Sequence, residues 1–343
     1  MNIPAQPWTK NDLPKRILAI RLQAMGDLAI TLPYLQALRN MLPPSTILDL
    51  LTRKEVDNIP RNLLLFNKIY SIGGKRNFRK QFIYTCFLLP VLLLRRYDVV
   101  LDLQNNEISR VVRKTLLPAA WCGFDRTSPI PAGERTRMTI ESLGLGEIVP
   151  CPDFCFRSDP NVDALLKQNG WDGKSEMVLI NPAGAFETRN WPIENYVAFM
   201  QLWLQRFPQT QFVMSGVDRI VSKMIYLKDV FGIKLIDLVN KSNPTEGFAI
   251  MKKIKLVLSE DSGLMHFAWV SDTPTLALFG STRSDWARPL GKHSLLLDSS
   301  DLPCGNCMLA HCRYDDVHCL TRYAPEFVFE KALGLLSSAG AVV

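Results

Sequence analysis

The sequence predicts an α/β protein of two doubly wound domains, each a mostly parallel sheet with helices on both faces. The chain of 343 residues is longer than one hydrophobic core usually supports. Short apolar runs alternate with helical or loop stretches, as they do in parallel sheets. This series begins again after the polar segment FRSDP at residues 156–160. We therefore expect one domain over residues 1–157 and a second over residues 158–343.

Local apolar runs predict the individual elements. The first domain opens with a buried strand at residues 16–21 and a helix that runs through Asn40 and ends before Pro43. Its later strands are expected at residues 47–51, 68–72, 97–103 and 119–124. In the second domain, strands are expected at residues 177–181, 211–215, 234–238, 255–259 and 275–279, with helices over 159–168, 194–206 and about 325–336. Two such domains place a ligand cleft between the carboxyl ends of their sheets.

Composition limits the class of partner. A hydrophobic fraction of 47% with 21% charged residues is typical of packed globular proteins and excludes disordered and collagen-like chains. The net charge of +7 favours nucleotides, phosphorylated glycans or acidic lipid. Nucleic acid is not expected, because no basic run alternates with aromatic residues. Residues 1–14 lack the apolar core of a secretory signal, so we expect a cytoplasmic protein with reduced or metal-bound cysteines.

One apolar segment, FIYTCFLLPVLLL at residues 82–94, is too short to span a bilayer and contains Pro90. Lysines and arginines flank it on both sides: Lys75, Arg76, Arg79, Lys80, Arg95 and Arg96. Two interpretations remain open. The segment is either a crossover helix packed on the sheet with solvated basic ends, or an interfacial helix that binds anionic lipid.

The loop after the first strand meets the positional expectation for a site. Gly26 permits a tight turn or a close approach of substrate, and Asp27 would stand at the start of a helix, facing the cleft. The alternative is that Asp27 is merely the N-cap of that helix. Gln104 and Asn105 follow another strand of this domain and are candidates for binding acceptor hydroxyls. The alternative is that these two polar residues only end the hydrogen-bonded ladder of the strand, as polar residues at strand ends commonly do.

In the second domain, Asp261, Ser262 and Gly263 follow an apolar strand and open a helix. Free backbone N–H groups at a helix start, next to a glycine, suit a diphosphate. His266 falls one turn inside that helix, where it would donate to phosphate or sugar. The alternative for His266 is a structural role with its ring already hydrogen-bonded.

Two further loops lie at the same predicted edge. Thr188 and Arg189 precede a helix, and the guanidinium offers a bidentate fork to a leaving phosphate. A solvated loop arginine is the alternative. Gly280 follows the strand at residues 275–279 and is expected to contact the donor. Neither a G-x-G-x-x-G fingerprint nor a G-x-x-x-x-G-K-[ST] phosphate loop occurs in the chain.

Four cysteines cluster near the end of the chain, beside His311 and His318: Cys304, Cys307, Cys312 and Cys319. Soft ligands in this number are enough for a tetrahedral zinc or iron site. Their spacing does not match the common finger and ribbon patterns. A loop of reduced thiols is therefore the alternative.

In their order and spacing these segments resemble glycosyltransferase family 9, the lipopolysaccharide heptosyltransferases. The resemblance extends from Ile17 to about Leu335. It is carried by ILAIRLQAMGDLAITLPYLQALR, YDVVLDLQNN, NPAGAFETRNWP, SEDSGLMHFAW followed by TPTLALFGSTRSDW, and the segment from PCGNC to HCL. It implies the GT-B fold, two Rossmann-like domains facing an interdomain cleft. It also implies that the terminal helix packs back on the first domain.

The resemblance further implies inverting, metal-independent transfer of a heptose from ADP-heptose to the inner core of lipopolysaccharide, with no cofactor needed for catalysis. The lipid-linked acceptor places the enzyme at the cytoplasmic face of the inner membrane. Asp27 matches the catalytic carboxylate, and Arg189 stands where the family has a basic residue, often lysine. Asp261, Ser262, Gly263 and His266 match the donor-binding segment.

Three alternatives remain. The chain could use another nucleotide sugar, or act as a non-catalytic, membrane-associated module that binds nucleotide sugars. A nicotinamide-dependent dehydrogenase is disfavoured by the missing glycine fingerprint.

Overall fold

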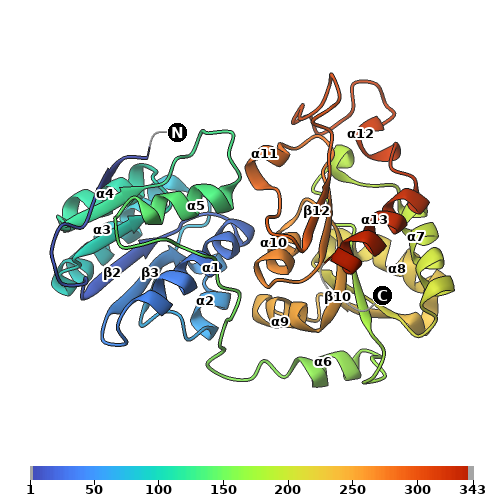
Figure 1. Ribbon diagram of the computed structural model, residues 1–343, viewed down its shortest axis with the longest axis horizontal. Helices are drawn as coiled ribbons and strands as arrows, with labels where there is room; N and C mark the ends of the chain where they lie inside the picture. Colours follow the sequence, from blue (N-terminus) through green and yellow to red (C-terminus); the bar gives the residue numbers. More distant parts are fainter. Residues whose placement is uncertain (1–2, 339–343) are drawn as a thin grey trace. The chain divides into compact units, whose positions relative to one another are not determined.

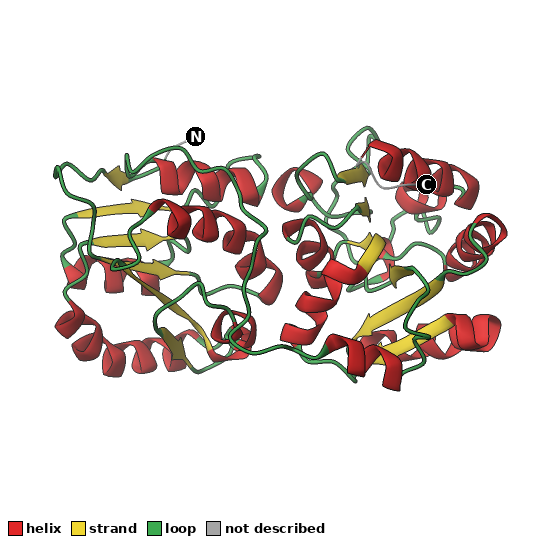
Figure 2. Cartoon of the chain, turned by 60° about the horizontal axis from the view of Figure 1, so that its bottom comes forward, coloured by secondary structure: helices red, strands yellow, loops and turns green. Residues whose placement is uncertain are grey.

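The computed structural model describes residues 3–338, and the chain divides into two compact units, Met1–Asp159 and Pro160–Val343. The division falls inside the FRSDP segment that the sequence singled out. Each unit is built on one six-stranded sheet (Figure 1). Figure 2 shows helices of each unit lying against its sheet. The structure confirms the predicted α/β class with two mainly parallel sheets.

The sheet of the N-terminal unit has the order β1-β6-β5-β2-β3-β4. All neighbours are parallel except β1, which pairs antiparallel with β6. The strands are β1 (Ala5–Gln6), β2 (Arg16–Ile20), β3 (Ile47–Arg53), β4 (Ile69–Ile72), β5 (Val99–Asp102) and β6 (Ala120–Gly123). Strand order reverses between β2 and β5, so the loops that follow these two strands meet at the switch point of the sheet.

The helices of this unit are α1 (Met25–Met41), α2 (Asn58–Asn62), α3 (Phe78–Arg95), α4 (Glu107–Leu116) and α5 (Ala132–Glu141). Helices α3 and α4 pack on one another, and α1 packs on α5. Leu92 of α3 and Val112 of α4 lie in one buried cluster with Ile20 and Val100 of the sheet. This side of the sheet is therefore covered by α3 and α4.

The sheet of the C-terminal unit has the order β12-β11-β10-β7-β8-β9 and is parallel throughout. The strands are β7 (Met177–Asn181), β8 (Gln211–Gly216), β9 (Leu235–Val239), β10 (Ile254–Glu260), β11 (Thr275–Leu278) and β12 (Ser294–Leu297). Here the order reverses between β7 and β10. The loops after β7 and β10 carry Arg189 and Asp261, so they occupy the switch point of this sheet.

The helices of this unit are α6 (Val162–Gln168), α7 (Ile193–Arg206), α8 (Val221–Phe231), α9 (Pro244–Ile250), α10 (Gly263–Val270), α11 (Ser284–Ala287), α12 (His318–Thr321) and α13 (Pro325–Ser338). Helix α13 confirms the helix expected at about residues 325–336. Its Phe329 ring lies 6.3 Å from Phe199 and 6.0 Å from Trp203 of α7. Contact of α13 with the first domain stays a prediction.

Strands β1 and β12 were not expected from the sequence. Strand β1 has two residues, too few for any periodicity, and exists because Ala5 pairs with Cys122, which is far along the chain. Strand β12 lies at the edge of its sheet beside β11. The other strands begin and end within a few residues of the predicted positions. Within residues 3–338 no helix is long and apolar enough to cross a membrane.

Candidate active site

Asp27 lies in the first turn of α1, at the carboxyl edge of the N-terminal sheet. The N-cap of this helix is Ala24, and no side chain caps it, so the interpretation of Asp27 as N-cap is wrong. Oδ1 of Asp27 lies 3.2 Å from Nη2 of Arg21. Within residues 3–338, Oδ2 accepts no hydrogen bond, and the side chain is 36% exposed. One carboxylate oxygen is thus anchored, and the other can accept a proton.

Arg21, directly after β2, is the buried cation that anchors Asp27. Its Nη1 donates to the carbonyl oxygen of Leu103, and its guanidinium lies 4.9 Å from the centre of the Phe124 ring. Burial lowers the pKa of Arg21, and the attraction of Asp27 opposes this effect. In the sequence, Arg21 is only the last residue of the strand expected at residues 16–21. The feature of the sequence that could have indicated its role is a charged residue at the end of a buried apolar strand.

The other candidates of this unit lie at the same edge, but their side chains bond within the protein. Gly26 is buried in the first turn of α1. Oε1 of the buried Gln104 accepts from the backbone N–H of Leu22 at 3.0 Å, which joins the loops after β5 and β2. Nδ2 of Asn105 donates to the carbonyl oxygen of Phe124 at 2.9 Å. A role of these three residues in acceptor binding stays a prediction.

In the C-terminal unit, Arg189 and Asp261 form an ion pair across the switch point. Nη2 of Arg189 lies 2.9 Å from Oδ2 of Asp261. The hydroxyl of Thr282, in the loop after β11, donates to the same oxygen at 2.8 Å. Arg189 also donates to the backbone carbonyl of Asp261. The interpretation of Arg189 as a freely solvated loop residue is wrong, because its guanidinium is held at the edge of the sheet.

The start of α10 is organised around Ser262. Its hydroxyl caps the helix by accepting from the N–H of Met265, and it receives a hydrogen bond from Nδ2 of Asn181 at 2.6 Å. A Cβ added at Gly263 would meet no atom within 4 Å, so the space beside this glycine is open. Exposed N–H groups beside open space can bind an anion.

His266 lies one turn inside α10 and is buried. Its Nδ1 accepts a hydrogen bond from Nε1 of Trp269 at 3.1 Å. In the neutral ring the proton is then on Nε2. The ring therefore has a structural partner, and a donor-binding role of His266 stays a prediction.

Sequence reasoning missed Glu260, the fully buried last residue of β10. Its carboxylate accepts from the backbone N–H of Gly184 at 2.6 Å and from that of Trp191 at 2.7 Å. Nζ of Lys223 lies 4.0 Å away. Burial raises the pKa of Glu260 to about 7, outweighing the attraction of Lys223. Glu260 thus fastens both ends of the loop that carries Arg189 to strand β10.

Thr188 and Gly280 hold two loops against one another. Oγ1 of Thr188 lies 2.8 Å from the Ser281 hydroxyl, and the N–H of Ser281 donates to the Thr188 carbonyl oxygen at 3.1 Å. A Cβ at Gly280 would lie 1.9 Å from that carbonyl oxygen. Close packing of the loops therefore requires glycine at position 280. Contact of Thr188 or Gly280 with a donor stays a prediction.

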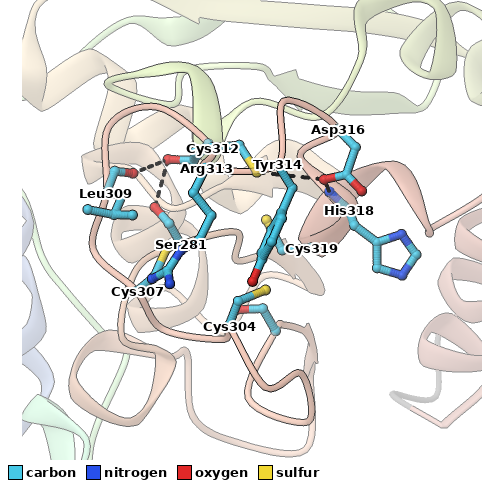
Figure 3. Close-up of a pocket in the computed structure, with 12 residues that line it drawn as sticks. Ser281, Cys304, Cys307, Leu309, Cys312, Arg313, Tyr314, Asp316, His318 and Cys319 are labelled. Carbon is cyan, nitrogen blue, oxygen red and sulfur yellow. Dashed lines mark hydrogen bonds between the residues drawn. The ribbon is translucent and has the colours of Figure 1, made fainter.

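The four C-terminal cysteines line one pocket, which we call the cysteine pocket (Figure 3). It also contains Asp316, whose Oδ1 lies 3.6 Å from Sγ of Cys312. Burial raises the pKa of Cys319 to about 11, and the other three thiols add to the shift. Within residues 3–338 no three Cys, His, Asp or Glu side chains are arranged to hold a metal ion. A zinc or iron ion would require these side chains to move, and its presence stays a prediction.

The sequence matches a known family. The family model described as glycosyltransferase family 9 (heptosyltransferase) matches residues 152–318. Lipopolysaccharide heptosyltransferase 1 of Campylobacter coli is 22% identical over 300 residues, which cover 78% of this chain and 85% of that protein. Through residues 152–318 the chain is thus similar to glycosyltransferase family 9, the family that its sequence resembles. It is therefore a glycosyltransferase, as the sequence predicted.

Solved structures agree on the fold. A family 9 glycosyltransferase from Veillonella parvula superposes with a TM-score of 0.76 at 17% identity, covering 94% of this chain and 97% of that one. ADP-heptose lipopolysaccharide heptosyltransferase II of E. coli superposes with a TM-score of 0.68 at 16% identity, covering 95% of this chain and 100% of that one. These likenesses confirm the GT-B class of the fold, with two Rossmann-like domains.

Proposed function

We propose that this enzyme transfers a heptose from ADP-heptose to the inner core of lipopolysaccharide, with inversion at the anomeric carbon and without a catalytic metal. The observation that carries the proposal is Asp27, a carboxylate with one oxygen anchored by Arg21 and the other unpartnered. The names of the matched relatives support the donor and acceptor classes. The lipid-linked acceptor would place the enzyme at the cytoplasmic face of the inner membrane.

In the proposed reaction Asp27 is the general base. The oxygen of an acceptor hydroxyl attacks the anomeric carbon as Oδ2 of Asp27 takes its proton. The bond from that carbon to the diphosphate oxygen breaks, and its electron pair leaves with ADP. Arg21 holds the carboxylate of Asp27 in one orientation through its hydrogen bond to Oδ1. The position of Oδ2 is thereby fixed as well. Attack opposite the departing oxygen inverts the anomeric configuration.

The C-terminal unit would bind the donor and stabilise the departing ADP. Helix α10 starts at Gly263, which has open space beside it, and a diphosphate bound there would meet the positive end of the helix. The ion pair with Asp261 holds the guanidinium of Arg189 in place. Its positive charge would stabilise the negative charge that develops on the departing diphosphate. A metal ion would then be unnecessary, because the protein supplies the positive charge.

Substitution of Asp27 tests the proposal. Asp27→Asn keeps the size of the side chain but removes the proton acceptor, so kcat should fall by roughly 10²- to 10⁴-fold with little change in the KM for ADP-heptose. Asp261→Asn is the control. It weakens the ion pair that holds Arg189, so it should mainly raise the KM for ADP-heptose. Activity should also survive EDTA.

Three outcomes would count against parts of the proposal. Full activity of Asp27→Asn would show that Asp27 is not the base. Faster transfer from another nucleotide sugar would replace heptose as the donor. A wild-type chain that binds ADP-heptose but transfers nothing to a purified core acceptor would favour the non-catalytic module.

A further inference from the structure

Helix α3 turns a mixed polar and apolar face toward the protein and a mostly apolar face away from it. Gln81, Thr85 and Leu92 are its buried residues, and two of the three are polar. Leu88 and Leu89 complete the inward face by packing on the core cluster. These positions recur every three or four residues, which places them on one side of the helix. The sheet is thus covered by the less apolar face of α3.

The outward face of α3 is apolar from Phe82 to Leu94, after a first turn that carries the exposed Arg79 and Lys80. Phe87 is 79% exposed, and Leu94 is 82% exposed. Six more large apolar residues of this helix are exposed: Phe78, Phe82, Ile83, Tyr84, Val91 and Leu93. A surface helix of a water-soluble domain normally shows the reverse pattern. A contiguous apolar face of this kind marks a surface that binds a partner.

Cations lie at both ends of this face. Lys75, Arg76, Arg79 and Lys80 surround the start of α3, and Arg95 and Arg96 are at its end. Residues 73–97 contain no aspartate or glutamate. In the part of the chain from residue 3 to residue 338, no ion pair joins the four cations at the start to a carboxylate. Lys75, Arg76 and Lys80 line an open hollow together with Asn77 and Tyr84.

We propose that α3 lies in the plane of an anionic membrane surface, with its apolar face in the acyl boundary and the flanking cations on lipid phosphates. A helix of 18 residues is about 27 Å long, enough to lie along the surface for its whole length. The hollow at Lys75, Arg76 and Lys80 would receive a headgroup phosphate. The structure confirms that the segment at residues 82–94 belongs to a helix packed on the sheet, and the lipid-binding interpretation of its outer face is the one proposed here.

Charge argues against a second copy of the chain as the occupant of this face. A two-fold symmetric contact would use the same patch on both copies. Here that would bring the flanking cations of the two copies together, and because α3 itself contains no aspartate or glutamate, like charges would repel across the contact. An anionic bilayer offers the opposite charge over the same length. The inference extends the proposed membrane location, but it rests on α3 and does not depend on the sugar-transfer chemistry.

Vesicle sedimentation with the full chain tests the proposal. Wild-type protein should sediment with vesicles of phosphatidylethanolamine and phosphatidylglycerol and should not sediment with pure phosphatidylcholine. The double variant Phe87→Ser with Leu94→Ser should bind the anionic vesicles at least about tenfold more weakly, because two large apolar side chains leave the acyl boundary. Lys75→Gln with Lys80→Gln should lose about fivefold for each cation removed.

Helix α8 and the turn after it supply a matched control. Ile225 is 58% exposed and Ile233 is 85% exposed, and Asp229 lies between them. Ile225→Ser with Ile233→Ser removes similar exposed area from a face whose neighbouring Lys228 and Lys234 donate to backbone carbonyl oxygens, so vesicle binding should not change. All replaced side chains are exposed, and thermal unfolding should show that each variant remains folded.

Two results would overturn the inference. Equal loss of vesicle binding in the α3 and α8 variants would mean that binding is not specific to α3. A lipid-free wild-type dimer that Phe87→Ser with Leu94→Ser converts to a monomer would show that a second copy covers this face. Transfer to a delipidated, soluble acceptor separates the two proposals: the α3 variant should retain it, whereas Asp27→Asn should lose it on any acceptor.

Discussion

Glu260→Gln should change the stability of the protein in a way that depends on pH. In the folded chain the pKa of Glu260 is raised from 4.5 to about 7 by burial. A carboxyl group with a raised folded-state pKa is protonated at low pH in both states, and it ionises more readily in the unfolded chain as pH rises. The unfolding free energy therefore falls between about pH 4.5 and about pH 7 and is level above that range. Glutamine removes this dependence.

The structure gives the expected size of both effects. The shift from 4.5 to about 7 corresponds to about 3 kcal/mol at 1.36 kcal/mol for each pKa unit. Glutamine has one oxygen in place of two, so the N–H of either Gly184 or Trp191 loses its acceptor. An unpaired buried N–H costs about 1–3 kcal/mol. The variant should therefore be less stable than wild type near pH 5, and the deficit should vanish or reverse near pH 8.

Urea denaturation followed by tryptophan fluorescence at both pH values provides the measurement, with hydrogen exchange at residues 184 and 191 as a local readout. Glu194→Gln is the control, because Glu194 is exposed in the first turn of α7 and its replacement should change stability little. A difference between wild type and Glu260→Gln that stays constant from pH 5 to pH 8 would refute the assignment of a buried carboxyl titrating near pH 7.

The remaining predictions concern two glycines and the cysteine pocket. Gly280→Ala places Cβ 1.9 Å from the carbonyl oxygen of Thr188 and should cost about 1–3 kcal/mol in thermal or urea unfolding, and unchanged stability would contradict the packing argument. Gly263→Ala meets no atom within 4 Å, so it should keep the protein stable yet raise the KM for ADP-heptose if that space receives the diphosphate. Elemental analysis of protein purified without added metal decides between the two interpretations of the cysteine pocket: stoichiometric zinc or iron would show a metal site, and its absence would leave four reduced thiols.

The sequence could predict the elements whose signal is local. The strand RILAIR and the turn before Asp27 were predicted from a run of apolar residues followed by glycine and an acid, and β2 and α1 lie there. The start of α10 was predicted in the same way, and Ser262 caps it. In both cases the signal lies within about ten residues, so no knowledge of distant contacts was needed. The order and spacing of these loops resemble a known family, and this resemblance predicted the class of enzyme.

Side-chain partners were harder to predict because they come from other strands. The N-cap interpretation of Asp27 was wrong because α1 begins at Met25, two residues earlier. The carboxylate of Asp27 instead pairs with Arg21. Arg189 was predicted as a phosphate ligand, but its pairing with Asp261 depends on β7 and β10 being neighbours. Nothing near Glu260 in the sequence indicates that its carboxylate accepts hydrogen bonds from the backbone N–H groups of Gly184 and Trp191.

By itself the sequence determined the α/β class, the strand and helix runs, and the presence of a carboxylate and a cation in loops after strands, because hydrophobic period and turn residues act over short distances. Only the tertiary structure decided which loops meet. Strand order placed β2 beside β5 and β7 beside β10. It also brought Glu260 to backbone groups 76 and 69 residues away in the chain. The apolar face of α3 was visible in the sequence, but only packing on the sheet determined that it points outward.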